Sequence, residues 1–267
     1  MASRTAHTAL VRLTHWINAV CVALLLMSGL QIFNAHPALY WGEISDFAHP
    51  TLAISTKKAN GEMRGVTIVA GRTFDTTGVL GVSSAAGGGS QSRAFPSWAT
   101  LPSWHSLADG RLWHFFAAWV FVLNGLVYLI SGALSRHLWH DLAPSWREVT
   151  GIGGAVWQHI RLRFPHGEEA RRYNVLQQLS YLAVIFGLLP LLILAGLAMS
   201  PRLDAGFPWL VELFGGRQSA RTVHFLCAAA LVGFGLVHVL MVLISGVFNN
   251  MRSMITGRYV IEGASDA

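Results

Sequence analysis

Charged residues are scarce in this chain of 267 residues, where aspartate, glutamate, lysine and arginine together make up 12%, against about 25% in a typical globular domain. Apolar residues make up 53%, and the mean hydropathy is +0.46. This composition excludes a disordered chain, a collagen-like repeat and a water-soluble domain. It indicates an integral membrane protein.

Cysteine is also nearly absent. Only Cys21 and Cys227 occur, far apart and inside apolar runs, so no disulfide framework is expected. Neither belongs to a C-x-x-C-H motif, which excludes covalent c-type haem attachment. The net charge of +6 could suggest a nucleic-acid partner. The basic residues, however, cluster at the ends of apolar segments, where they act as membrane orientation signals, and no nucleic-acid partner is expected.

Four apolar stretches are long enough to cross a bilayer, which takes about 20 residues in a helix. We expect an all-α membrane protein, a four-transmembrane-helix bundle in a single integral membrane domain. The first stretch is too long for the apolar region of a signal peptide, so we interpret it as a retained span. The expected domain covers residues 1–267, with spans at about 13–34, 112–134, 177–200 and 221–248.

The basic residues of the connecting segments predict the orientation. The N-terminus, the loop 135–176 and the C-terminus together hold ten arginines, whereas the loop between the last two spans holds three. The basic residues of the first loop, 35–110, are disregarded, because loops of this length cross the membrane largely independently of their charge. We therefore expect both termini in the cytoplasm, a long periplasmic loop at 35–110, a cytoplasmic loop at 135–176, and a multi-pass location in the bacterial inner membrane among its lipids.

Two loop segments carry local patterns. Residues 66–69 alternate weakly and residues 78–92 are rich in glycine and serine, which predicts a small β-hairpin with a flexible tail, or partial disorder. Residues 144–148 resemble a capping box, and apolar residues follow at helical spacing. That helix could lie along the inner membrane surface or pack against the ends of the bundle. Its apolar positions are Trp146, Val149, Ile152, Val156 and Ile160.

Four of the twelve histidines, His15, His114, His224 and His238, fall within the expected spans. An ionisable group at membrane depth is costly and therefore a functional candidate, although a single histidine can simply hydrogen-bond a neighbouring helix. His224 and His238 are fourteen residues apart, which is about 40° short of four helical turns, so both face the same side. Their separation along the helix axis is about 21 Å, too far for one shared metal ion.

The expected topology gives each of these two histidines a partner. His15 begins the first span on the cytoplasmic side and can meet His238, while His114 begins the second span on the outer side and can meet His224. Two imidazoles are too few ligands for zinc. They are the right number for the axial positions of a haem iron, and a helical bundle can hold such a flat cofactor in its core.

Arginine precedes three of these histidines by three residues, at Arg12, Arg111 and Arg221. Positions i and i+3 share a helix face, so each guanidinium could bind a haem propionate or simply snorkel to the membrane surface. Glycines in the spans could admit a macrocycle or serve close helix packing. They are Gly29, Gly125, Gly132, Gly233 and Gly235.

The histidine pattern, with one on span one, one on span two and two on span four, resembles the bacterial/Ni-hydrogenase type di-haem cytochrome b family. This family includes the cytochrome b subunits of formate dehydrogenase, thiosulfate reductase and nickel-iron hydrogenase. The long first loop departs from the formate dehydrogenase pattern, and the thiosulfate reductase branch is closest. The resemblance rests on residues 11–16 (VRLTHW), 110–114 (GRLWH), 173–178 (YNVLQQ) and 216–224 (GRQSARTVH).

The resemblance implies two non-covalent b-type haems, with His114 and His224 holding the outer one and His15 and His238 the inner one. It implies electron transfer between a periplasmic oxidoreductase, often a molybdenum enzyme, and the quinone pool.

A quinone site would lie near the inner haem. Candidate residues for it are Arg12, Asn18, and Arg136 and His137 at the end of the second span.

Two other functions are compatible with histidines inside membrane spans. A haem-free transporter or proton relay could use intramembrane histidines, but such proteins usually show paired broken helices or an internal repeat, and here only Pro190 interrupts a span. An enzyme in its own right would need reactive groups, yet no nucleophile, acid–base dyad or nucleotide loop is evident. Any reaction would be redox chemistry at the haems or at a quinone.

Overall fold

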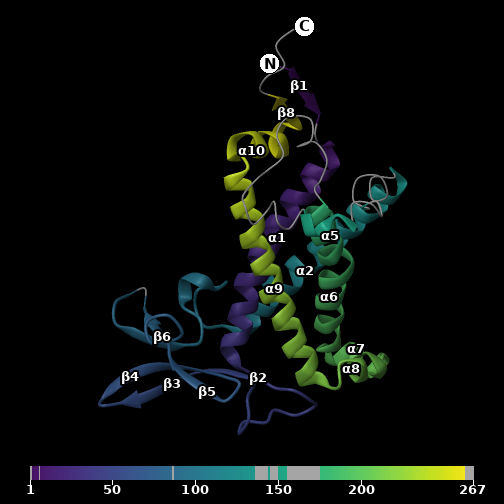
Figure 1. The fold of residues 1–267 in the computed structure, drawn as a ribbon. Coiled ribbons are helices and arrows are strands. Elements are labelled where there is room, and N and C mark those ends of the chain that lie inside the picture. Colours follow the sequence, from purple (N-terminus) through teal and green to yellow (C-terminus); the bar gives the residue numbers. More distant parts are fainter. Residues whose placement is uncertain are drawn as a thin grey trace. The chain divides into compact units, whose positions relative to one another are not determined.

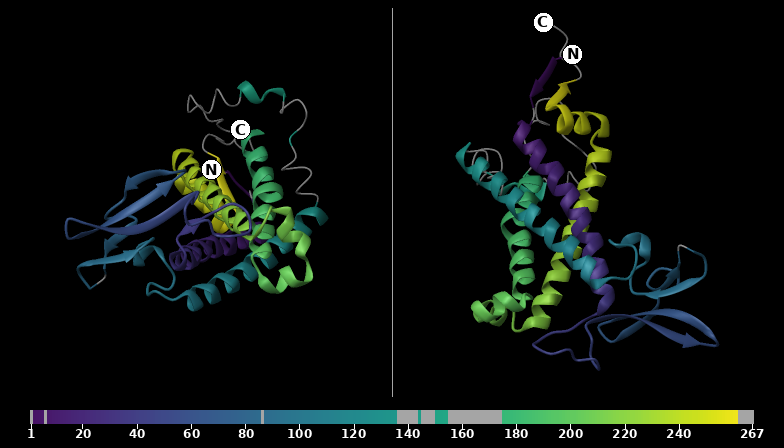
Figure 2. Two further views of the ribbon diagram at one scale, coloured as in Figure 1. Left: turned by 90° about the horizontal axis from the view of Figure 1, so that it is seen from below. Right: turned by 180° about the vertical axis from the view of Figure 1, so that it is seen from behind.

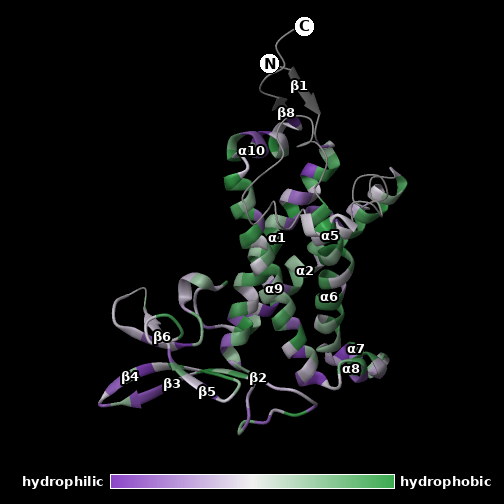
Figure 3. Ribbon diagram, in the orientation of Figure 1, coloured by the Kyte–Doolittle hydropathy of each residue, from purple (hydrophilic) through white to green (hydrophobic). Residues whose placement is uncertain are grey.

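The computed structural model describes residues 2–5, 7–85, 87–135, 144, 150–154 and 175–261. Within these residues four helices are long and apolar enough to cross a membrane (Figure 1), and Figure 3 shows hydrophobic residues along each of them. The expected all-α membrane protein with four spans is confirmed. The spans are Ala9–Ala35, Leu107–Leu134, Val175–Ala198 and Arg217–Ile244.

Three of the spans are single α-helices, and the third is interrupted. Its middle part is a π-helical segment, in which the N–H of Leu189 reaches the carbonyl of Val184 five residues back. Pro190 follows directly and has no N–H to continue the regular ladder, so the wider turn coincides with a helix-breaking residue. The helices are α1 (Ala9–Ala35), η1 (Ser97–Ala99), α2 (Leu107–Leu134), α5 (Val175–Leu182), η4 (Ala183–Leu188), α6 (Leu189–Ala198), α7 (Pro201–Gly206), α8 (Pro208–Leu213), α9 (Arg217–Ile244) and α10 (Val247–Thr256).

The chain divides into two compact units. Unit 1 comprises Met1–Asn18, Leu123–Pro190 and Ala229–Ala267, and unit 2 comprises Ala19–Val122 and Leu191–Ala228. Helices α1, α2, α6 and α9 contribute residues to both.

In unit 2 the loop between the first two spans forms two antiparallel sheets (Figures 1 and 2). The larger has the strand order β2-β3-β4-β5, and the smaller pairs β6 with β7. Residues 66–69 lie on β4, as the alternation predicts. The glycine- and serine-rich stretch, expected as a flexible tail, instead forms the β6–β7 hairpin. The strands are β2 (Ala38–Leu39), β3 (Leu52–Ala59), β4 (Glu62–Val69), β5 (Arg72–Asp75), β6 (Gly81–Ser84) and β7 (Ser90–Arg93).

Hydrogen bonds from side chains explain why this polar stretch is ordered. Thr56 on β3 bonds the hydroxyl of Ser92 on β7 at 2.6 Å and donates to the carbonyl of Gly81 on β6 at 2.9 Å. These partners are 36 and 25 residues away from Thr56 in sequence, so composition alone does not reveal them.

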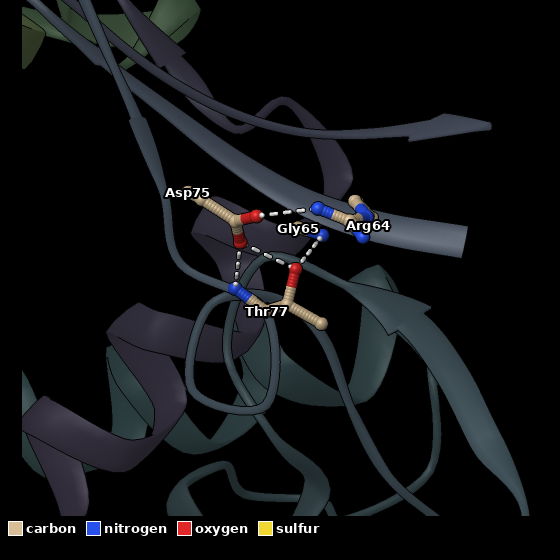
Figure 4. Close-up of polar contacts among 4 residues, drawn as sticks. All are labelled: Arg64, Gly65, Asp75 and Thr77. Atoms are coloured by element: carbon tan, nitrogen blue, oxygen red, sulfur yellow. Dashed lines mark hydrogen bonds and ion pairs between the residues drawn. The ribbon is translucent and has the colours of Figure 1, made fainter. Parts of the chain in front are cut away.

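The turn after β5 is held against β4 by hydrogen bonds of its side chains (Figure 4). Asp75 accepts hydrogen bonds from the backbone N–H and the hydroxyl of Thr77, and the N–H of Gly65 donates to that hydroxyl oxygen at 3.0 Å. A Cβ at Gly65 would lie 2.0 Å from the carbonyl oxygen of Leu80. Only glycine fits there, because the obstacle is backbone.

Two apolar clusters fix the helix ends of unit 2. Phe33 near the end of α1 packs with three residues of the loop, Leu39, Ile54 and Ala94. The short helix α8 packs against α6 and α9 through a second cluster, which consists of Ala198, Leu210, Val211 and Ala220.

In unit 1 the ends of the chain pair with each other. Strand β1 (Ala2–Thr5) runs antiparallel to β8 (Arg258–Ile261), which follows α10. Trp16 donates its indole N–H to the carbonyl of Met254 at 3.1 Å. The helix predicted after the capping box at 144–148 lies largely outside the described residues.

Candidate functional site

Each unit contains one pair of the membrane-embedded histidines. In unit 1, His15 of α1 meets His238 of α9, with ring centres 6.3 Å apart and planes tilted by 56°. In unit 2, His114 of α2 meets His224 of α9, with ring centres 6.2 Å apart and an interplanar angle of 65°. These are the partners that the sequence predicts.

The spacing fits two imidazoles on opposite sides of one metal ion. An imidazole nitrogen binds a metal at about 2 Å, and the ring centre lies about 1 Å behind that nitrogen, so two opposed rings on one metal have centres about 6 Å apart. Both pairs match this value. No group of three or more histidine, cysteine or acidic side chains gathers within the part of the chain that the structure describes. A metal held here therefore needs other equatorial ligands, and a porphyrin supplies four.

Ser28, together with the backbone of Leu25, to which His114 also hydrogen-bonds, determines which nitrogen of His114 is free. The Nδ1 of His114 lies 3.1 Å from the hydroxyl of Ser28, and that hydroxyl lies 2.6 Å from the carbonyl oxygen of Leu24. A carbonyl only accepts, so the single hydroxyl proton of Ser28 goes to Leu24. The serine oxygen must then accept the proton of Nδ1, which leaves the lone pair on Nε2 for a metal.

His224 is held in the same tautomer. Its Nδ1–H donates to the carbonyl oxygen of Leu192 on α6 at 2.8 Å. Histidines that bind metals usually donate their other ring N–H in this way, which fixes the ring and raises the basicity of the ligating nitrogen. Both rings of the unit 2 pair are therefore oriented for metal binding through Nε2.

The unit 1 pair is oriented mainly by aromatic packing. His238 stacks on Phe234, with ring centres 6.1 Å apart and planes at 16°, and Phe234 meets the ring of Tyr181 edge-on at 6.3 Å. The Nδ1 of His15 is buried and has no hydrogen-bond partner among the described residues. The two pairs thus share a spacing but differ in their support.

Glycines lie against the two imidazoles of unit 2. A Cβ at Gly196 would lie 3.1 Å from Cε1 of His224, and one at Gly29 would lie 3.5 Å from Cε1 of His114. A Cβ at any of three further glycines would meet no described atom within 4 Å, so close helix packing does not explain them. These three are Gly125, Gly233 and Gly235.

The three arginines predicted beside the histidines have different surroundings. Arg221 donates to the carbonyl of His36 and lies over the ring of Phe33 at 5.7 Å. Arg111 is exposed, with its guanidinium 5.6 Å from the ring centre of Phe115.

Arg12 donates to the carbonyl of Ile255 in the last turn of α10, where a cation stabilises the helix dipole. In the described chain the ion pairs are Asp46–His49 and Arg64–Asp75. None of the three arginines therefore has a carboxylate partner there, and each can accept one.

An asparagine that the sequence analysis did not single out lies near the unit 1 pair. Buried Asn124 of α2 donates to the carbonyl of Thr14 at 2.8 Å and to the side-chain oxygen of Asn18 at 2.7 Å. Asn18, a quinone-site candidate, is thus partly engaged. The other two candidates on this side, Arg136 and His137, lie outside the described residues.

Ser28, Gly196 and Asn124 were all missed from sequence. A polar residue inside a span is a signal for Ser28 and Asn124, since such side chains often hydrogen-bond between helices. Gly196 had no comparable signal, because its role depends on the ring of His224 on another helix.

The chain is similar to a known family and to a known protein. Residues 6–257 match the family described as prokaryotic cytochrome b561. The putative protein-methionine-sulfoxide reductase subunit YedZ1 of Azospira oryzae is 28% identical over 236 residues, which cover 88% of this chain and 89% of the relative. No solved structure matches the chain.

Proposed function

Since the chain belongs to the prokaryotic cytochrome b561 family, we propose that it is a di-haem electron-transfer subunit linking a periplasmic oxidoreductase to the quinone pool. Membership confirms the resemblance that the histidine spacing indicates, and with it a membrane electron-transfer protein that binds b-type haem. The number of haems, the partner and the quinone are the proposed parts.

The observation that carries the proposal is the presence of two histidine pairs with the same spacing, 6.3 Å in unit 1 and 6.2 Å in unit 2. His114 and His224 would hold the outer haem, and His15 and His238 the inner one. A haem in such a site supplies one-electron transfer at its iron. With both imidazoles of a pair holding the iron, no ligand position would be left for a substrate, which favours electron relay over chemistry at the metal.

The chain's own residues prepare these sites. The Ser28 hydroxyl and the Leu192 carbonyl keep Nε2 of the outer histidines unprotonated, so no proton has to leave when a metal binds. Arg12, Arg111 and Arg221 would receive the propionates, since guanidinium binds carboxylates well and these three have no carboxylate partner in the described chain.

Helix α9 is the basis for the proposed position of each histidine pair across the membrane. His224 and His238 lie fourteen residues apart on the uninterrupted helix α9, about 21 Å of axial rise. With both termini in the cytoplasm, His224 belongs to the periplasmic side of the inner membrane and His238 to the cytoplasmic side. Two centres at these depths would divide the electron's path across the membrane.

For the partner, we propose the catalytic subunit of a periplasmic reductase, because the relative is named as a subunit of a protein-methionine-sulfoxide reductase. The molybdenum type is proposed from the family resemblance. Quinone exchange is proposed near the inner pair, at Asn18 and Arg12 and at Arg136 and His137. Asn124 joins this set through its bond to Asn18.

No observation favours the transporter alternative. Among the four described spans the irregular segment is Ala183–Leu188 before Pro190, and α1, α2 and α9 are continuous. A paired interruption, which transporters typically show, is not found in these helices.

Haem content per chain tests the proposal. Purified protein should contain two b-type haems, measured as the pyridine haemochrome, and His224→Ala and His238→Ala should each remove one. His49→Ala is the matched control, because that histidine is exposed in the loop and should leave the haem content unchanged. A full haem content in both span variants would refute the assignment.

A further inference from the structure

The chain between the β6–β7 hairpin and α2 folds back along the first span. The backbone N–H of Phe95 donates to the side chain of Asn34, near the end of α1, at 2.8 Å. Six residues later, the N–H of Leu101 donates to the carbonyl of Met27 at 3.1 Å. From 95 to 101 the chain therefore runs inward along α1, and Figures 1 and 2 show this stretch beside the helix rather than beyond its end.

The chain then turns outward again. The side chain of Gln31, one turn beyond Met27, donates to the carbonyl of Trp104 at 3.1 Å. Arg93 connects the two ends of this stretch. Its guanidinium donates to the carbonyl of Ser103 and to the side-chain oxygen of Gln31, both at 2.6 Å. Residues 95–104 thus form a re-entrant segment with its two ends held together.

The bottom of this segment lies at the depth of lipid hydrocarbon. Helix α1 has 27 residues and is about 40 Å long, close to the full bilayer thickness, whose hydrocarbon core is about 30 Å. Met27 lies eight residues before the end of α1 at Ala35, which is about 12 Å inward. Leu101, bonded to Met27, is therefore deeper than the headgroup layer.

Several backbone groups of the segment suit this depth. Pro96 and Pro102 have no N–H to satisfy, while the N–H groups of Ala99 and Thr100 donate to the carbonyls of Pro96 and Ser97 at 3.0 and 3.3 Å. Backbone donors in hydrocarbon need such internal partners.

The exposed side chains of residues 95–104 are Trp98, Ser103 and Trp104, so two of the three are tryptophans. Trp98, in the turn η1, is 80% exposed. Beside it is a groove of about 570 Å³ whose walls come from the first span and from the loop. The lining includes Leu26, Met27 and Leu30 of α1, and Leu80, Phe95 and Trp98 of the loop.

We propose that residues 95–104 insert into the membrane leaflet on this side as a re-entrant anchor, with Trp98 against lipid and the groove filled by a lipid acyl chain. One wall of the groove is formed by Leu26, Met27 and Leu30 of the membrane span α1, and Leu26 is 37% exposed, which argues for lipid rather than a protein as its occupant. Tryptophan is also the residue that favours the membrane interface.

Site-directed spin labelling tests the insertion. In proteoliposomes of phosphatidylcholine, a nitroxide at Trp98→Cys should be accessible to oxygen and shielded from a water-soluble nickel chelate. The matched control is Phe47→Cys, because Phe47 is 76% exposed in the loop after β2 and should show the opposite accessibility. The unsubstituted protein, in which Cys21 and Cys227 are buried, corrects for background labelling.

Two results would overturn the proposal. Nickel accessibility at position 98 equal to that at position 47 would place the segment in water. Protection of position 98 from both reagents would mean that protein covers it.

Two conservative tryptophan variants test the insertion without a spin label. Brominated lipids quench tryptophans that touch acyl chains, so Trp98→Phe should lower the quenched fraction of the fluorescence. Trp41→Phe, which removes a tryptophan that is 55% exposed in the loop after β2, should not lower it. Equal changes in both variants would contradict the insertion.

Discussion

Ser28 is a small residue whose hydrogen bond to His114 sets the tautomer of a proposed haem ligand. Outer partners of this kind typically contribute 10- to 100-fold in metal affinity. We therefore expect Ser28→Ala to weaken the outer haem site by about 10- to 100-fold, measured as haem transfer to a competing apoprotein. Ser28→Thr, which keeps the hydroxyl, should restore binding.

The control for this substitution is Ser131→Ala. The Ser131 hydroxyl also donates to a carbonyl of its own helix, that of Tyr128 at 3.0 Å. Equal loss of haem in Ser28→Ala and Ser131→Ala would mean that the effect comes from the helix rather than from the histidine.

Substitution of Gly196 gives a second prediction for a single residue. A methyl group there would lie 3.1 Å from Cε1 and 3.2 Å from Nδ1 of His224, so Gly196→Ala should displace the ring and reduce haem content to about one per chain. Gly187→Ala in the same span is the control, since its Cβ would meet no described atom within 4 Å. Unchanged haem spectra in Gly196→Ala would show that the ring tolerates the contact.

His36, just beyond the end of α1, is expected to make the stability of the folded protein depend on pH. Burial, and then the positive charge of Arg221, lower the pKa of His36 below its ordinary value of 6.5. The folded state thus resists protonation more than the unfolded chain. The stability that this causes is present above pH 6.5 and is lost as the pH falls through the lowered pKa.

We expect His36→Gln to lose less stability than the natural chain between about pH 7 and pH 5, where histidines titrate. Thermal unfolding followed by tryptophan fluorescence at both pH values measures the difference. Parallel acid losses in the two proteins would exclude His36 as the cause.

Among the elements, the two sheets of the loop depend on a close backbone approach at Gly65. Because an added Cβ would lie 2.0 Å from the Leu80 carbonyl oxygen, Gly65→Ala should destabilise the loop by about 1–3 kcal/mol, the usual cost of overpacking. Faster limited proteolysis of the loop would report it. Gly87→Ala, where a Cβ meets no described atom, should leave the rate unchanged, and equal rates in both variants would refute the argument.

The spans could be predicted from the sequence because their length and apolar composition are local properties. The re-entrant segment could not be, since it depends on contacts such as that between Arg93 and Gln31, 62 residues apart. The histidine pairs could be predicted from the sequence only in part. Helical periodicity aligns His224 with His238, and the topology supplies their partners, but Ser28 and Gly196 depend on the packing of other helices.

For the whole molecule, the proposed order of centres predicts how quinol reduces the protein. If quinol donates at the inner pair, the haem that remains in His224→Ala should still be reduced by a ubiquinol analogue. The haem that remains in His238→Ala should be reduced only by dithionite. Visible spectroscopy of each variant in membranes distinguishes the two cases, and the reverse pattern would place the quinone at the outer pair.

Helix α9 supplies one histidine to each pair, and this couples the two centres through geometry. Insertion of a single residue between positions 224 and 238 would rotate one histidine by about 100° relative to the other, so at most one pair could keep its partner. The interval can grow or shrink only by nearly whole turns, and each turn also moves a centre by about 5.4 Å through the lipid. In the proposed di-haem arrangement, the distance between the two centres would therefore be matched to the thickness of the membrane.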